Sequence, residues 1–418
     1  MDIVVERCCG LDVHQETVVA CLVTGGAGRK TQKEIRTFRT FTADLEALRK
    51  WLTEERCEQV GMESTGVYWV PVYEVLEGGP FSLVVGNAAH IKNVPGRKTD
   101  VKDAEWLARL LRAGLIRKSY VPDAEIRRLR KLVRYRRSVI EARVDERNRL
   151  HRELELCNIK LATVATDIFG KSGWLMLKAL VASNQTPEQM AELAKGKLRN
   201  KTDELTLAMH GRLDDEDRWI LQRQIERLEA LDAEVVTVDA RIDAQLAAHS
   251  ELRQRLTTIP GVSVVVAAVL LAEIGVSVDA FPTERHLAKW AGLCPGNNES
   301  AGKRYSTRIT GGNPFLRSIL VEAAGAATRK KDSYYKVKFH KLKAHMPYKK
   351  AMVAIAHKLL IATYHVIQSG KPYRELGAGY LDKLQERRVV RNHVHRLEAL
   401  GYGVTLTPRQ PQEVQAPG

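Results

Sequence analysis

Four acidic residues in this sequence have the types and spacing of metal-binding carboxylates. Asp12 closes the apolar run VVERCCGLD, and Glu63 closes a second short apolar run, CEQVGMES. Asp100 and Asp103 stand three apart in KTDVKDAEWLARLL, so they point from one face of one expected helix. Carboxylates at strand ends that face two helical carboxylates can hold a pair of Mg²⁺ ions across a phosphodiester. We therefore expect a nucleic-acid backbone as substrate and two Mg²⁺ ions as cofactors, with Mn²⁺ as a substitute.

Each of these carboxylates also has an ordinary interpretation. Acidic residues are by default solvated surface charges, and Asp100 and Asp103 could simply favour a helix N-terminus through its dipole. Asp12 is harder to explain in this way, because an unpaired carboxylate in an apolar strand is costly. The ordered set with its intervening strands favours the metal site.

Composition points to a polyanionic partner. The 418 residues are enough for two or three domains, and 66 Lys and Arg against 50 Asp and Glu give a net charge of +16. Such a basic surface suits nucleic acid or an anionic membrane. The apolar stretch 262–272 is well short of the roughly 20 residues of a membrane span, so we expect no membrane partner.

The cysteines and the first residues indicate a cytoplasmic location. The six cysteines include no CxxC pair and no zinc-like spacing with histidine, which is typical of reduced, buried thiols. No signal-peptide pattern opens the chain.

Residues 1–122 alternate strand-like and helical segments, with strands expected at 2–12, 16–24, 35–41, 58–63 and 82–86 and helices at 43–55, 67–78 and 100–113. Three early strands followed by alternating helix and strand predict a mixed α/β layer fold. The dipeptide Val121-Pro122 closes this unit.

Residues 123–255 predict a long helical region. In the helix 123–161, 11 Arg or Lys against 3 acids between Arg127 and Arg152 favour a phosphate-binding face, represented by Arg130, Arg134 and Arg137, over a merely solvated one. In the helix 214–252 apolar residues step by three or four, as in a coiled coil. This seam could join two chains, or it could pack within one chain as an antiparallel hairpin.

Residues 256–370 predict a third, mainly helical unit. The segment LTTIPGVSVVVAAVLLAEIG has the pattern of a phosphate-binding helix-hairpin-helix, but Ser263 replaces the usual second glycine, so a structural αα-hairpin explains it equally well. Next comes a glycine-rich segment between Pro295 and Pro314, in which glycines permit close backbone approach and cations neutralise phosphate. Its expected nucleic-acid-binding residues, with one from the following helix, are Lys303, Arg304, Arg308 and Arg317.

Four motifs together resemble a known family. The segments GLDVHQ, GMESTGVYW, GRKTDVKDAEWLA and GLCPGNNESAGKRYSTRITGGNPFLR, in this order, resemble the DEDD insertion-sequence transposases of the IS110 family. The resemblance covers residues 3–370. It implies an N-terminal RuvC-like, RNase H-type domain (1–122), a coiled-coil region (123–255), a mainly α C-terminal transposase domain (256–370) and a tail (371–418). Carried over by position, it assigns Asp12, Glu63, Asp100 and Asp103 to the metal site.

The resemblance also implies a reaction and its partners. A nucleophilic serine matches Ser300, although by spacing alone Ser306 and Thr307 would be equally eligible hydroxyls. The implied protein is a site-specific DNA recombinase that moves its own element. It acts on donor and target DNA under the guidance of a bridge RNA, as dimers that pair into a tetramer. Two alternatives stay open: a RuvC-like nuclease or junction resolvase that hydrolyses DNA directly, and a non-catalytic basic nucleic-acid-binding protein.

Overall fold

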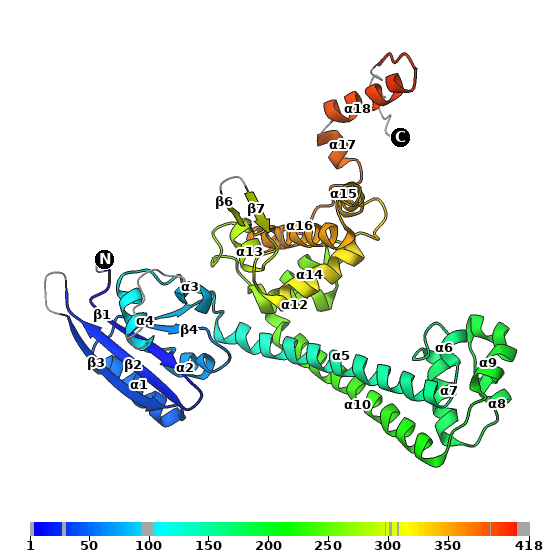
Figure 1. The fold of residues 1–418 in the computed structure, drawn as a ribbon, viewed down its shortest axis with the longest axis horizontal. Coiled ribbons are helices and arrows are strands. Elements are labelled where there is room, and N and C mark those ends of the chain that lie inside the picture. Colours follow the sequence, from blue (N-terminus) through cyan, green and yellow to red (C-terminus); the bar gives the residue numbers. More distant parts are fainter. Residues whose placement is uncertain are drawn as a thin grey trace, which may run out of the picture. The chain divides into compact units, whose positions relative to one another are not determined.

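The computed structural model describes residues 4–26, 31–92, 103–296, 298–300, 303–306, 309–384 and 386–407. The chain forms two compact units, Met1–Pro122 and Asp123–Gly418, and each is described by itself. Figure 1 shows the elements of both.

The first unit is built on a five-stranded mixed sheet in the order β3-β2-β1-β4-β5. Its strands are β1 (Arg7–Val13), β2 (Thr17–Thr24), β3 (Gln32–Arg39), β4 (Gln59–Glu63) and β5 (Ser82–Gly86). β2 is antiparallel to β1 and β3, whereas β1, β4 and β5 are mutually parallel along the sheet. The predicted α/β domain of RNase H type is therefore confirmed.

Helices cover both faces of this sheet. On one face, α1 (Thr42–Glu54) and α2 (Trp69–Leu76) bury the apolar residues of alternate strand positions, among them Leu11 and Met62. On the opposite face lies α4 (Asp103–Arg112), which packs on Cys8, Cys21 and Val84. A short helix, α3 (Ala88–Lys92), follows β5.

The second unit begins with a long helical hairpin, α5 (Ala124–Leu156) and α10 (Asp215–Gln245), which lie side by side in Figure 1. Asp123 caps α5, its Oδ1 accepting from Ile126 N at 2.8 Å. The seam residues Leu221, Ile225, Leu228, Val238 and Ile242 are buried within the single chain. The structure therefore shows the intramolecular hairpin, one of the two alternatives, and α10 ends at Gln245 rather than near 252.

The connection between these helices is a small helical subdomain with its own core. It contains α6 (Leu161–Val164), α7 (Lys171–Ala182), α8 (Pro187–Glu192), a 3₁₀ turn (Gly196–Lys201) and α9 (Thr202–Met209). Met176, Leu180 and Leu205 belong to this core, which also includes residues of α5 and α10. The shorter helices predicted for 162–213 are thus confirmed.

The rest of the unit is mostly helical, apart from one β-hairpin. After a 3₁₀ turn (Ala247–His249) it comprises α11 (Ser250–Thr257), α12 (Val264–Ile274), α13 (Glu284–Trp290), β6 (Asn298–Ser300), β7 (Lys303–Ser306), α14 (Pro314–Ala327), α15 (Tyr334–Lys343), α16 (Tyr348–Ser369), α17 (Tyr380–Leu384) and α18 (Glu386–Ala399). By length and composition α16 is apolar enough to cross a membrane, but 56% of its most apolar window is buried. It packs against α11, α13, α14 and α15, which is the position of a core helix.

The turn between α11 and α12 packs against α14. Gly261 has a φ of +82°, and a Cβ there would lie 2.2 Å from the carbonyl oxygen of Ala323, so the close approach requires glycine. Ser263, which departs from the helix-hairpin-helix pattern, caps α12 by accepting from Val266 N at 3.2 Å. These contacts favour the interpretation as a structural αα-hairpin.

Candidate active site

Asp12 and Glu63 stand side by side at one edge of the sheet. Gly10 pairs with Gly61 and Leu11 with Met62 in the parallel β1–β4 ladder, so the next step brings the two acids together at the carboxyl ends of the strands. Because side chains alternate along a strand, both acids share the face of Gly10 and Gly61. That is the face covered by α4, since Leu11 and Met62 point to the opposite core.

The helix α4 brings Asp103 to the same edge. A Cβ on Gly10 would lie 2.2 Å from Ala104 O, and Cys8 Sγ donates to Ala108 O at 3.4 Å. The helix therefore runs antiparallel to β1, and its first residue, exposed Asp103, comes next to the carboxyl end of that strand. We call Asp12, Glu63 and Asp103 the carboxylate edge; Asp100 lies outside the described residues.

A short repeat explains how the helix fits. Each strand acid follows a glycine by two residues, in Gly10-Leu11-Asp12 and Gly61-Met62-Glu63. A Cβ on Gly61 would lie 3.1 Å from Leu111 Cδ2 of α4. The glycines let the helix lie directly on the strands, and the acids follow at the next position on that face. This glycine–acid spacing is a sequence signal of the site that was not anticipated.

Each strand acid has a hydrogen-bonding partner close to it in sequence. His14 Nε2 lies 3.1 Å from Asp12 Oδ2, and the Thr65 hydroxyl donates to Glu63 Oε1. Among the described residues, the oxygens of the carboxylate edge do not gather within 4.8 Å of one another. The backbones of β1, β4 and α4 place the three acids at the same edge of the sheet. Carboxylate oxygens are the ligands that Mg²⁺ prefers, so the donor set fits this ion. His14 and Thr65 were not anticipated from the sequence.

The backbone of Ser300 ends the strand β6 of a β-hairpin. Ser300 pairs with Lys303, and Glu299 with Arg304, so the serine stands next to the turn. The glycine-rich segment therefore contains a two-stranded hairpin, which we call the serine hairpin (295–309). Thr307 and Arg308 lie outside the described residues, and Ser306 ends β7.

Backbone packing holds the base of the serine hairpin between α13 and α14. Pro295 bridges to Ile309, and Thr310 N donates to Cys294 O at 3.2 Å. Gly292 has a φ of +71°, and a Cβ on Gly312 would lie 2.3 Å from Gly292 N. Two glycines are needed because the two backbones touch.

A fully buried carboxylate anchors this base to the long helix. Glu273 of α12 is 0% exposed and forms a paired contact with Arg134 of α5, at 2.9 Å (Nε to Oε1) and 3.0 Å (Nη2 to Oε2). Asn313 Nδ2 donates to Glu273 Oε2 at 2.6 Å, while Asn313 Oδ1 accepts from the first N–H groups of α14. Arg130 donates to the carbonyl oxygens of Ala272 and Glu273 at 3.0 and 2.8 Å.

The sequence contained a signal for this network: a single acid in the apolar run VVVAAVLLAEI, which cannot be buried without partners. The internal role of Arg130 and Arg134 was not anticipated. Their contacts with nucleic acid stay a prediction, as do those of Arg137, which is paired with Glu141 at 2.8 Å.

The positive charge of α5 is partly neutralised by neighbouring helices. Arg136 pairs with Asp239 and Arg143 with Asp232, both acids of α10. These partners come from a distant part of the sequence, so the charge of α5 alone did not indicate them. Near the base of the serine hairpin, Arg134 and Arg137 lie 4.3 and 5.4 Å from the ring of Phe315, two residues before half-buried Arg317.

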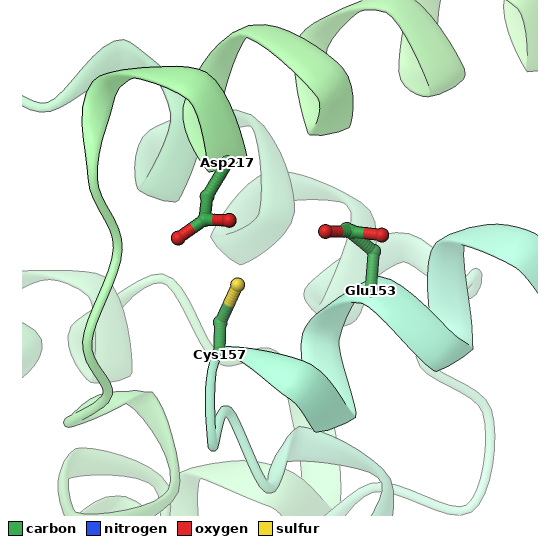
Figure 2. A group of neighbouring side chains, drawn as sticks. All are labelled: Glu153, Cys157 and Asp217. Carbon is green, nitrogen blue, oxygen red and sulfur yellow. The ribbon is translucent and has the colours of Figure 1, made fainter.

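A second acidic group lies where the hairpin helices meet the small subdomain. The ligand atoms of Glu153, Cys157 and Asp217 lie within 4.8 Å of one another (Figure 2). Burial, followed by the charges of Asp217 and Glu153, raises the pKa of the Cys157 thiol to about 11, so the thiol keeps its proton and bonds to Asp217. Asp217 also accepts from Asp214 N at 3.1 Å in the cap of α10. These bonds account for the group, and we assign it no ligand.

Residues of both units match families of transposases. Residues 9–159 match a family model of DEDD transposases of IS110, and residues 253–339 match the transposase family IS116/IS110/IS902. Together the two matches cover more than half of the chain.

Curated relatives align over part of their length. The chain is 32% identical over 140 residues to an uncharacterized 43.6 kDa protein of insertion element IS110 from Streptomyces coelicolor, which covers 32% of this chain and 33% of that protein. It is 29% identical over 165 residues to the candidate transposase y4rJ of Sinorhizobium fredii, covering 35% of this chain and 41% of the relative. The chain thus spans about a third to two fifths of the length of the relatives it matches.

Proposed function

Because this chain belongs to the IS110 family of DEDD transposases, we propose that it moves its own insertion element by cutting and rejoining DNA at specific sites. The observation that carries the proposal is the carboxylate edge: two strand-end acids in register, with a third at the start of the helix that crosses them. Gly10 and Gly61 let α4 lie directly on the strands, and this close packing brings Asp103 to the edge where the two strand acids end.

The carboxylate edge, completed by Asp100, would hold two divalent ions, Mg²⁺ or Mn²⁺. Such ions supply positive charge at a scissile phosphate and polarise its oxygens. Asp12, Glu63 and Asp103 provide oxygen ligands, and His14 orients the Asp12 carboxylate through its 3.1 Å contact. The group that attacks the phosphate then decides whether the energy of the phosphodiester bond is retained for rejoining.

We assign the attack to Ser300. Its Oγ forms a bond to phosphorus, the bond from phosphorus to one bridging oxygen of the DNA breaks, the serine proton passes to solvent, and the released oxygen takes up a proton. The phosphodiester is retained as a protein–DNA link, so a hydroxyl of another strand can reverse the step without ATP. Lys303, Arg304, Arg308 and Arg317 would neutralise phosphate charge around it.

The family resemblance further supports a bridge RNA that selects donor and target by base pairing, leaving the protein to bind backbone and shape. It also supports dimers that pair into a tetramer, in which the carboxylates and the serine of one active site come from different protomers. Sequencing RNA that co-purifies with the chain tests the first part; sedimentation of the complex with DNA tests the second.

The central test is a covalent adduct. The chain is incubated with Mg²⁺, its co-purifying RNA and DNA carrying the element ends, and products are separated under denaturing conditions. The Ser300→Ala variant should bind DNA but form no adduct. The Asp12→Asn and Glu63→Gln variants should neither cleave nor join DNA. Ser306→Ala and Glu46→Gln, an exposed acid of α1, are the matched controls and should remain active.

Two results would contradict the proposal. Cleavage without an adduct in the unmodified chain would identify a hydrolytic nuclease with a structural Ser300. Full recombination with the Asp12→Asn variant would show that the metal site is not needed. It would favour the alternative that this chain is a non-catalytic basic nucleic-acid-binding protein and that another protein performs the reaction.

A further inference from the structure

A cavity lined by tyrosines and cations lies at the C-terminal end of the second family match, which ends at residue 339, and most of its lining residues follow that match. It has a volume of about 360 Å³, within the usual range of ligand sites, and is formed by α15, α16 and the segment 371–380. Four aromatic rings line it: Tyr334, Tyr335, Tyr373 and Tyr380. We call it the tyrosine pocket; α15, α16 and α17 are labelled in Figure 1.

The four rings form one connected cluster. Tyr335 and Tyr373 are stacked with centroids 6.0 Å apart, and Tyr334 meets Tyr335 and Tyr380 edge-on at 5.3 and 5.9 Å. Tyr335 is buried, whereas Tyr380 is 36% exposed, so the cluster runs from the core to the surface. A planar ligand can therefore extend an aromatic array that already exists.

Hydrogen bonds from distant segments hold the pocket in shape. Tyr373 N donates to Thr258 Oγ1 of the segment after α11 at 2.8 Å, and Tyr334 N donates to Glu375 Oε1 at 2.9 Å. Lys341 of α15 pairs with Asp382 of α17 at 2.6 Å. Since these bonds preset the walls, a ligand would pay little for ordering them.

Cations outnumber acids around the pocket. Lys358, Lys371 and Arg374 line it, and one acid, Glu375, lies beside it, where its carboxylate accepts from Tyr334 N. A second cavity, of about 430 Å³ and also lined by residues of α15, has Lys331 and Lys336 with one acid, Asp332, in its wall. Within the part of the chain that the structure describes, none of these five cations forms an ion pair. A ligand with a planar ring and a negative charge could stack on the aromatic rings and pair with the cations.

We propose that the tyrosine pocket binds an unpaired nucleotide of a single-stranded nucleic acid, with the base against the tyrosines and the phosphates along the cations. Proteins that bind single-stranded nucleic acids combine aromatic rings with Lys and Arg side chains that have no acidic partner. Every base can stack on a ring, and every phosphodiester linkage carries a negative charge that a cation can neutralise. A base inside a duplex is already stacked on its neighbours and paired, so it is not free to stack on the tyrosine rings. This inference goes beyond strand exchange and depends on neither the carboxylate edge nor Ser300.

The test measures binding by the full chain. Fluorescent oligothymidylate, oligouridylate and a short duplex are titrated at several salt concentrations and followed by anisotropy. Tyr380→Ala should weaken single-strand binding by about five- to one-hundred-fold, the range for loss of one base stack, and change duplex binding by less than about two-fold. Tyr380→Phe, which keeps the ring, should bind as the unmodified chain does. Tyr402→Ala, which removes an exposed tyrosine outside the pocket, is the matched control.

Charge and position are tested separately. Arg374→Gln should reduce the salt slope of single-strand binding by about 0.7, the value for one lost phosphate contact. Strands carrying 5-iodouracil should crosslink on irradiation to the peptide that contains Tyr373 and Tyr380. Tighter binding of oligouridylate identifies RNA as the source of the nucleotide, and tighter binding of oligothymidylate identifies DNA.

Three outcomes would overturn the proposal: unchanged single-strand affinity in Tyr380→Ala, an equal loss of duplex affinity in that variant, or crosslinks confined to other peptides. Because binding is measured without cleavage, these outcomes are independent of whether the chain forms a covalent adduct.

Discussion

Removal of the Glu273 carboxylate should destabilise the second unit more than removal of an exposed acid does. Glu273 is fully buried and receives hydrogen bonds from Arg134 and Asn313. Deleting one partner of a buried ion pair costs about 3–5 kcal/mol, because the other charge loses its compensation. We expect Glu273→Ala to cost about 3 kcal/mol, the lower end of that range. Arg134 is 38% exposed and can reach water, and Arg130 keeps its two carbonyl acceptors.

The assay is urea unfolding followed by circular dichroism, with hydrogen exchange to localise the effect. Glu273→Gln retains the shape and part of the hydrogen bonding, so its cost should be about 1–2 kcal/mol. Faster exchange should appear at the start of α14, where Asn313 caps Phe315 and Leu316. The control Glu322→Ala removes an exposed acid of α14 and should change stability by less than about 0.5 kcal/mol.

Loss of no more stability in Glu273→Ala than in Glu322→Ala would refute this prediction. Equal destabilisation of the Ala and Gln variants with no change in exchange at α14 would also contradict it, because the Glu273 side chain would then fill space rather than hold Arg134 and the Asn313 cap.

Other predictions follow from single residues. Gly10→Ala should lower the unfolding free energy by about 3 kcal/mol or more, since its Cβ would meet the backbone of α4, whereas Gly61→Ala meets only a movable leucine tip and should cost less in a urea titration. The hydrogen bond from Lys33 holds the pKa of Glu105 below its usual range. Its stabilisation is therefore full at neutral pH and lost as pH falls through the folded pKa. The destabilisation by Glu105→Gln should fade below about pH 4 in thermal melts; a constant difference would contradict this. Burial raises the pKa of both Cys294 and Cys157, that of Cys157 to about 11. Because Cys294 is half-buried whereas Cys157 is buried, iodoacetamide at pH 8 should modify Cys294 before Cys157, as mass spectrometry would show.

Local pattern was sufficient to predict most elements of the first unit. The strands β2, β4 and β5 and the helix α4 lie close to the predicted ranges, because apolar alternation and helical spacing are properties of consecutive residues. The first strand, predicted at 2–12, begins only at Arg7. The thiols predicted to be reduced and mostly buried are free cysteines, with Cys294 half-buried. The apolar seam of 214–252 was recognised for the same reason, but its partner was not. An apolar stripe is equally well buried by a second chain or by α5, and only the folded chain shows the latter.

Local sequence was enough to predict that Asp12 and Glu63 end apolar strands and that Asp103 lies near the start of a helix, which was expected at 100–113 and is observed from Asp103. Tertiary structure decided that these acids adjoin, because the parallel pairing of β1 with β4 and the contact of Ala104 with Gly10 join residues far apart in the chain. The partners of Glu273 and the rings of the tyrosine pocket were likewise decided only by folding. Periodicity tells which side of an element is buried, whereas shape and charge complementarity between distant segments select what buries it.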